Sequence, residues 1–222
     1  MVDQACFQRR NASGGAMMGS AGPVSAGGIL AGTMVETGRG WSPVEDVLPG
    51  TMVQTFDGGS RAVRRVCHRP LEHLLGQGMN IVHVPAGALD NCSDLELLAE
   101  QRVLLDLAEA DSAFGAPLVL VPAGALDGWR GIRCRESMQP MTAVSLIFDD
   151  EEVVFANTGV LMHCPTAELT GSARISDFFT PLDFGPCRHL LFPEPGGQDG
   201  RVIPLHGRPS APGRMVRTLL AE

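Results

Sequence analysis

The sequence predicts an all-β domain built of many short strands, and three observations support this. Glycine and proline supply 27 and 16 of the 222 residues, a level that favours turns over long helices. From Gly28 onward, strand-like segments alternate with turns at a spacing of about 10–12 residues. The segment 84–91 recurs as 121–128 with seven of eight positions identical, which indicates two equivalent β units within one domain.

The first elements can be placed in order along the chain. Residues 1–27 are rich in small residues and predict a flexible leader. Segment 33–37 is compatible with a strand, and segment 43–47 is expected to turn Val44 and Val47 inward. Strands over 51–56 and 61–66, joined by Asp57-Gly58-Gly59, predict a hairpin.

The later elements are less uniform. Segment 94–113 fits a helix by propensity, although Val103-Leu104-Leu105 equally suits a buried strand, so both remain open. Strands over 143–148 and 153–156 predict a second hairpin, with residues 149–152 as its solvated tip. The patterned domain spans 28–170, and 171–222 reads as a partly ordered C-terminal extension whose last residues, 214–222, suit a short helix.

Charge and composition exclude several classes of function. All 17 basic residues are arginine and tyrosine is absent, so lysine-dependent and tyrosine-dependent catalysis is impossible. A net charge of −8 argues against a nucleic-acid partner. The chain shows neither a long apolar span nor a secretory h-region, so we expect no membrane partner. The six scattered cysteines suit reduced thiols in a cytoplasmic protein.

Several short motifs, taken in their order and spacing, resemble the bacterial Hedgehog/intein (Hint) domain of the second type. The resemblance covers roughly residues 28–165 and implies an all-β, horseshoe-shaped fold with pseudo-two-fold symmetry and short helical segments, in agreement with the internal repeat. The motifs are Ala31-Gly32-Thr33, Pro43-Val44-Glu45-Asp46-Val47, Pro49-Gly50, Thr55-Phe56-Asp57-Gly58-Gly59, Val84–Asn91, Glu100–Leu105, Phe148-Asp149 and Val153-Val154-Phe155-Ala156.

Active members of this superfamily cleave their own backbone. The resemblance implies a cysteine or serine at the domain start that attacks the preceding carbonyl in an N-to-S or N-to-O acyl shift. A histidine of the second conserved block then protonates the leaving nitrogen, and further polar groups act near the domain's end. In this chain the corresponding positions hold other residue types: Gly28, Gln101 or Arg102, Ser145, and Glu151 or its neighbour Asp150.

These replacements predict a Hint-like domain that has lost autoproteolysis and serves as a module for binding a protein or peptide, or for assembly. The alternative is a self-processing Hint domain that uses another nucleophile. Cys6 is one weak candidate, but 25 residues separate Phe7 from Thr33.

His163 and Cys164 are the other weak candidates for a catalytic pair. Adjacent strand residues point to opposite faces, so one should be buried and one exposed, and the same holds for Cys67 and His68.

Metal and cofactor sites are not expected. Cys187 and His189 would share one side of an extended segment, but no pair of closely spaced ligands accompanies them. The carboxylates of residues 149–152 lack the spacing of a calcium loop. Trp41 and Trp129 are expected to fill the core or a cleft, and Arg130 and Arg133 beside Trp129 to form salt bridges or hold a partner's carboxylate.

Overall fold

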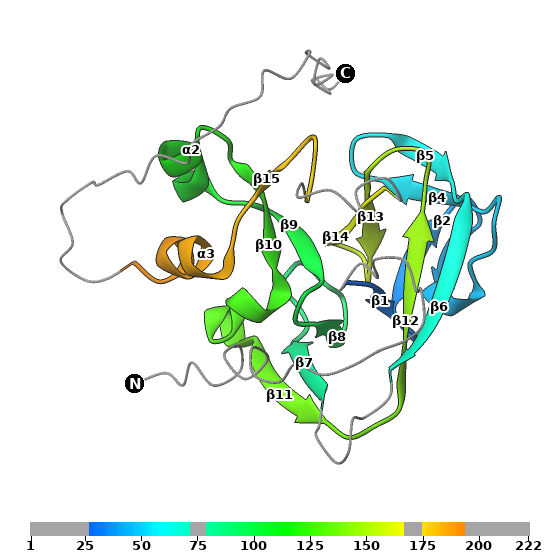
Figure 1. Cartoon of the computed structure of the whole chain (residues 1–222), viewed down its shortest axis with the longest axis horizontal. Coiled ribbons are helices and arrows are strands. Elements are labelled where there is room, and N and C mark those ends of the chain that lie inside the picture. Colours follow the sequence, from blue (N-terminus) through cyan, green and yellow to red (C-terminus); the bar gives the residue numbers. More distant parts are fainter. Residues whose placement is uncertain (1–26, 72–78, 167–174, 194–222) are drawn as a thin grey trace, which may run out of the picture.

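The computed structural model describes residues 27–71, 79–166 and 175–193, and within them the predicted all-β fold is confirmed (Figure 1). The largest sheet has the order β15-β10-β9-β14-β13-β2-β4-β5, with β3 added to β2. Apart from β15, which is parallel to β10, these strands pair antiparallel. Its members are β2 (Met34–Thr37), β3 (Gly40–Pro43), β4 (Met52–Thr55), β5 (Gly59–Ala62), β9 (Arg102–Asp106), β10 (Leu118–Pro122), β13 (Glu152–Ala156), β14 (Val160–Cys164) and β15 (Thr180–Pro181).

Two smaller antiparallel sheets flank the large one. One has the order β1-β12-β6, from β1 (Ile29–Leu30), β12 (Met141–Ile147) and β6 (Arg65–Leu71). The other has the order β11-β7-β8, from β11 (Arg133–Ser137), β7 (Met79–Val84) and β8 (Leu95–Leu98). Helical segments are short: η1 (Val44–Asp46), α2 (Ala108–Phe114), η2 (Ala123–Leu126), η3 (Trp129–Gly131) and α3 (Phe184–Leu191). None of the helices in the described residues is long and apolar enough to cross a membrane.

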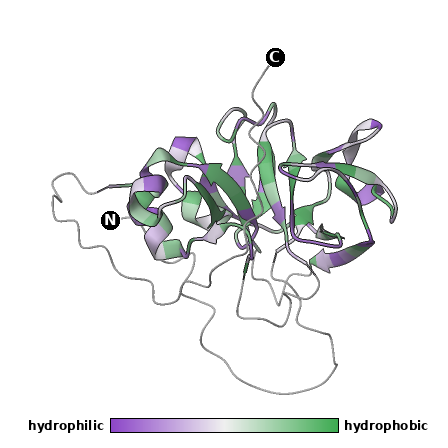
Figure 2. Cartoon of the chain, turned by 90° about the horizontal axis from the view of Figure 1, so that it is seen from above, coloured by the Kyte–Doolittle hydropathy of each residue, from purple (hydrophilic) through white to green (hydrophobic). Residues whose placement is uncertain are grey.

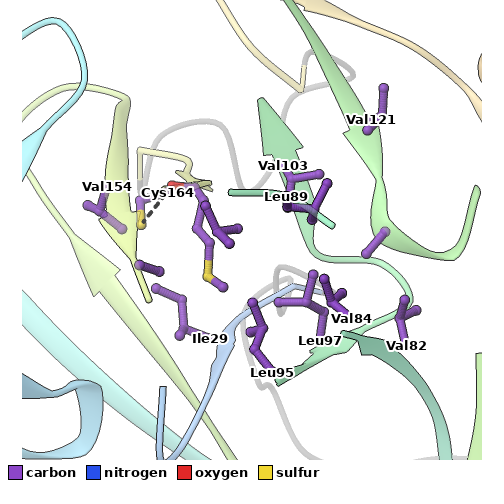
Figure 3. Close-up of a cluster of buried hydrophobic side chains, with 14 of the residues drawn as sticks. Ile29, Val82, Val84, Leu89, Leu95, Leu97, Val103, Val121, Val154 and Cys164 are labelled. Atoms are coloured by element: carbon purple, nitrogen blue, oxygen red, sulfur yellow. Dashed lines mark hydrogen bonds between the residues drawn. The ribbon is translucent and has the colours of Figure 1, made fainter. Parts of the chain in front are cut away.

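The main core lies where the three sheets meet. It takes aliphatic side chains from every sheet, including Ile29 of β1, Leu97 of β8 and Val154 of β13 (Figure 3). Figure 2 shows hydrophobic residues concentrated on these central strands. Val44, the first residue of η1, and Val47, which follows its last residue, are both buried, as their spacing predicts. Because these contacts join residues far apart in sequence, no single sheet is an independent unit.

The two copies of the internal repeat take equivalent places in the fold. The first begins at the end of β7 and leads to β8, and the second begins at the end of β10 and leads to β11. Leu89 and Leu126, the same position of the two copies, are both buried. The repeated sequence therefore encodes a repeated strand–turn–strand unit within one fold.

The prediction that the strands over 143–148 and 153–156 form a second hairpin is wrong. β12 pairs with β6 along seven residues and with β1, whereas β13 pairs with β14, β2 and β4. The connecting residues pass from one sheet to another. Alternating hydrophobicity identifies a strand but not its partner, and here long-range pairing decides.

The ambiguous segment 94–113 contains both expected elements. β8 and β9 occupy its strand-like parts, and α2 begins at Ala108. α2 ends because Gly115 adopts a left-handed backbone conformation (φ +70°) and its N–H donates to the Asp111 carbonyl. In the first hairpin, β5 begins at Gly59, pairs with β4 and ends at Ala62. The predicted strand over 61–66 is therefore divided, since its last two residues begin β6, which pairs with β12.

Several burial predictions are wrong. Trp41 lies on the outer strand β3 and is 42% exposed, so it does not fill the core. Trp129 is partly buried and packs against the main core. Cys67 and His68 are both exposed, because β6 is an outer strand of its small sheet. The leader through residue 26, Cys6, and the segment 214–222 lie outside the described residues.

Candidate functional site

The start of the patterned domain lies against Gln101. The Gly28 N–H donates to Gln101 Oε1 over 3.0 Å. The Gln101 amide group in turn donates from Nε2 to the carbonyls of Arg102 (2.9 Å) and His163 (3.1 Å). These three contacts hold the side chain, which is almost completely buried in the turn between β8 and β9. The backbone N–H of Gly28 is therefore hydrogen-bonded to a neutral carboxamide.

The carbonyl on the other side of the same peptide bond is also held. Arg69 of β6 donates from Nη2 to the Gly27 oxygen over 3.3 Å. The peptide group joining Gly27 and Gly28 thus has its acceptor bound by a cation and its donor bound by an amide oxygen. Such a pair of contacts fixes the position and orientation of this one peptide group. We call Gly27, Gly28, Arg69, Gln101 and Ser145 the junction site.

Glycine at position 28 is required by the backbone and by its neighbours. Its φ of +147° is a conformation that side-chain-bearing residues rarely adopt. An added Cβ would lie 3.1 Å from the Cβ of Ala143 and 3.6 Å from Ser145 Oγ. The Ser145 hydroxyl therefore borders the space into which a side chain at position 28 would project.

Arg102, the other residue considered for the second conserved block, serves a different purpose. It donates from Nη1 to the carbonyls of Leu120 (3.2 Å) and Leu182 (2.8 Å), and so joins β10 to the segment after β15. Burial lowers the pKa of its guanidinium group, while Asp183 and Cys187 oppose this shift. The structure thus places Gln101, and not Arg102, at Gly28.

Glu151 and His163 form a separate buried pair. His163 Nε2 lies 2.8 Å from Glu151 Oε1, and the same carboxylate accepts hydrogen bonds from the Ser176 hydroxyl and, over 2.8 Å, from the Asp177 N–H. Burial raises the pKa of Glu151, but the bonds from His163, Ser176 and Asp177 outweigh it and hold that pKa below its usual value. We call Glu151, His163 and Ser176 the carboxylate latch.

The latch overturns two expectations about this region. Glu151 and Glu152 are both buried, so residues 149–152 are not a uniformly solvated tip; only Asp149 and Asp150 are exposed. His163 and Cys164 are both buried, because β14 is covered on its two faces. Ser176 had no signal in the sequence, since its role depends on a segment folding back from beyond the patterned domain.

The comparisons with known proteins decide the family. The Hint domain family model matches residues 28–161. The chain belongs to the Hint domain family. The match begins at Gly28, the residue whose N–H is bound by Gln101. No curated protein is matched.

Among solved structures, this Hint domain is similar to a bacterial intein-like domain from Clostridium thermocellum, with 17% identity and a TM-score of 0.44 over 62% of this chain and 98% of that one. The AceL NrdHF class 3 split intein, in a splice-inactive variant, gives 14% identity and a TM-score of 0.42 over 63% of this chain and 98% of that one. The gp41-1 intein gives 14% identity and a TM-score of 0.38 over 62% and 98%.

The two buried cysteines of the described residues, Cys164 and Cys187, are poor nucleophiles. Cys164 lies in the main core (Figure 3), where burial raises the pKa of its thiol to about 12, with a further rise from Glu152. Burial likewise raises the pKa of the Cys187 thiol to about 12. At neutral pH both are thiols and not thiolates.

The predicted extended segment around Cys187 and His189 is instead the helix α3, because residues 184–191 pack their apolar side chains against the core. In a strand these two side chains would share one side, but residues two positions apart on a helix do not face the same way. Within residues 27–71, 79–166 and 175–193, no group of three or more His, Cys, Asp or Glu side chains is placed to hold a metal ion.

A pocket of about 550 Å³ opens beside the first residues of the Hint domain. Its lining combines apolar with charged side chains, among them the ion-paired Glu96 and Arg135. The lining residues are Leu30, Ala31, Gly32, Thr33, His83, Asp94, Leu95, Glu96, Arg135, Pro140, Met141, Thr142 and Asn157.

Proposed function

We propose that this Hint domain does not cleave its own chain and serves as a module that binds a protein or peptide. The observation that carries the proposal is the contact of Gly28 N–H with the Gln101 amide oxygen. In the Hint reaction this nitrogen must leave as a protonated amine, and a histidine supplies the proton. The glutamine carboxamide does not ionise near neutral pH and so cannot act as a general acid, and Gly28 has no nucleophilic side chain.

The junction site nevertheless keeps the features needed to hold extended backbone. The peptide group between Gly27 and Gly28 is bound through both its oxygen and its nitrogen. The next two residues add to β12 as the short strand β1, and Ala31 N–H continues this pattern by donating to the Thr142 carbonyl. These contacts with the domain's own main chain support a site that pairs with extended peptide backbone.

The first test is the intact mass of the purified full chain before and after incubation with hydroxylamine or dithiothreitol, both of which trap acyl intermediates. We expect a single species of unchanged mass. Fragments corresponding to residues 1–27 and 28–222 would contradict the loss of self-cleavage.

Self-processing is the second candidate function, and the position of Ser145 is the observation that favours it. Its hydroxyl borders the space beside Gly28, and Arg69 holds the carbonyl that an attack would polarise. In such a reaction Ser145 Oγ would bond to the Gly27 carbonyl carbon. The hydroxyl proton would pass to the Gly28 nitrogen as the C–N bond breaks, leaving an ester that hydroxylamine cleaves.

Ser145→Ala separates the two candidates in the same mass measurement. If fragments form in the natural chain and disappear in Ser145→Ala, self-processing through this serine is the function. Ser60→Ala is the matched control, since Ser60 is exposed on β5, a strand of a different sheet. If neither the natural chain nor either variant is cleaved, self-processing is excluded and the loss of self-cleavage stands.

A further inference from the structure

Three arginines from different elements contact or border residues 127–129, where the second repeat ends. Arg130 lies in η3, Arg133 begins β11 and Arg188 lies in α3. Figure 1 shows α3 and β11 in the same half of the molecule. A Cβ added to Gly128 would lie 3.6 Å from the Phe192 ring and 3.8 Å from Arg133 Nη1, so both border this glycine. We call Trp129, Arg130, Arg133, Arg188 and Phe192 the arginine–aromatic surface.

Two of the guanidinium groups are oriented by aromatic rings. The Cζ of Arg130 lies 4.2 Å from the centre of the Trp129 ring, and that of Arg188 lies 4.1 Å from the centre of the Phe192 ring. These are distances for cation–π contact. Arg130 also adopts a left-handed φ of +47°, which only a few residues with side chains do. The cations are therefore held in place before any partner arrives.

The remaining contacts of these arginines are hydrogen bonds to backbone carbonyls, which satisfy guanidinium N–H donors but do not neutralise the positive charge. Arg130 Nη1 donates to the Ala88 carbonyl over 3.3 Å, Arg133 Nη1 donates to the Ile132 carbonyl over 3.0 Å, and Arg188 donates to the Asp127 carbonyl.

Across residues 27–71, 79–166 and 175–193, none of these three guanidinium groups forms an ion pair with a carboxylate. The Asp127 carboxylate is used instead by the Cys134 N–H, which donates to its Oδ1 over 2.8 Å. In a chain of net charge −8, this is a local concentration of uncompensated positive charge.

We propose that the arginine–aromatic surface binds a protein segment bearing several carboxylates. Guanidinium groups match the planar geometry of carboxylates and bind them through paired hydrogen bonds. Trp129 and Phe192 supply apolar shoulders for the aliphatic parts of such a segment. The proposal rests on the binding role proposed above and names the class of partner, but it uses residues distinct from the junction site, so the failure of one proposal can be told from the failure of the other.

The charge balance favours an acidic protein segment over nucleic acid. Nucleic-acid affinity grows with the number of phosphates neutralised, and three arginines neutralise few. A long polyanion would also extend over the rest of an acidic molecule and be repelled by it. A short acidic segment avoids this repulsion, because its carboxylates do not extend beyond the arginine–aromatic surface.

The experiment measures fluorescence anisotropy of a fluorescein-labelled octaglutamate peptide titrated with the full chain at low salt, about 50 mM, and at about 300 mM. The double variant Arg130→Gln/Arg133→Gln removes two exposed cations without touching the more enclosed Arg188. Its matched control is Arg39→Gln/Arg65→Gln, which removes the same charge from two exposed arginines on other elements. Labelled oligothymidylate of similar length tests the nucleic-acid alternative.

We expect octaglutamate to bind at low salt and weaken at high salt, with affinity reduced at least about tenfold in Arg130→Gln/Arg133→Gln and changed less than about twofold in the control. Absence of binding, or equal loss in both double variants, would overturn the assignment of the surface. Tighter binding of oligothymidylate than of octaglutamate would replace the acidic segment by nucleic acid. Circular dichroism of each variant establishes that it is folded.

Discussion

At the scale of single residues, the Glu151 carboxylate gathers donors from distant parts of the chain. It accepts from His163 on β14 and from Ser176 and Asp177 beyond the family match. Its side chain is 1% exposed, so an unpaired charge here would be costly. The carboxylate latch therefore contributes to stability by joining the segment after residue 175 to the sheet.

Replacing Glu151 tests this contribution and its dependence on pH. Because hydrogen bonds depress the folded-state pKa of Glu151, its stabilisation is complete above the ordinary glutamate pKa of about 4.3 and is lost as pH falls through the depressed value. We expect Glu151→Gln to lower the free energy of unfolding by about 2–4 kcal/mol at pH 7. The difference from the natural chain should shrink below about pH 4, as measured by urea denaturation at several pH values.

Asp149→Asn is the control for the urea denaturation of Glu151→Gln. Asp149 pairs with Arg64 at the surface, where both side chains are largely exposed, and solvent weakens such pairs. Its urea midpoint should stay close to that of the natural chain. A pH-independent loss in Glu151→Gln would show that the side chain acts through packing and not through its charge.

At the scale of elements, the hairpin of β4 and β5 encloses a polar cluster beneath its turn. The sequence Asp57-Gly58-Gly59 predicted the turn, but not why the second position is glycine. A Cβ on Gly58 would come within 2.6 Å of Arg61 Nε and 2.8 Å of both Glu152 Oε2 and Thr55 Oγ1. Arg61 and Glu152 are themselves an ion pair at 3.3 Å. The glycine thus leaves room for a partly buried ion pair.

Gly58→Ala should therefore destabilise the domain by about 1–3 kcal/mol, because the new methyl group must displace polar atoms held by one another. Thermal unfolding followed by circular dichroism measures the effect. Gly185→Ala is the control, since in helix α3 its Cβ would meet no atom within 4 Å. That change should be neutral or stabilising by up to about 1 kcal/mol. Equal destabilisation by the two substitutions would show that glycine content itself, and not the cluster, matters.

The same scale shows what local sequence can predict. The strands, the η1 turn and the repeated units follow from alternation, turn residues and self-similarity. The partners of β12 and β13 do not, because both are apolar enough to pair with several strands. At the junction site, the spacing of the family motifs identified Gly28, Gln101 and Ser145 as the positions that correspond to catalytic residues. Arg69 was missed because it lies on another strand, 41 residues after Gly28, and contacts only a backbone oxygen.

At the scale of the whole molecule, residues 175–193 belong to the packed core although they follow the family match. β15 extends the large sheet beside β10, and Leu182 and Cys187 lie in the main core. Arg102 donates to the Leu182 carbonyl, and Leu182 N–H donates to the Leu120 carbonyl. A segment bound by both backbone and core contacts should unfold together with the sheet it covers.

Leu182→Ala tests whether the domain and this segment form one cooperative unit. Leu182 is 2% exposed, so truncation should cost about 2–4 kcal/mol, as for a leucine within a core. Tryptophan fluorescence and far-UV circular dichroism should report the same single transition at a lower temperature. Leu48→Ala, at a position 66% exposed, should change stability by less than about 0.5 kcal/mol. Two separate transitions, or a small effect at Leu182, would mean that the segment folds onto an already complete Hint domain.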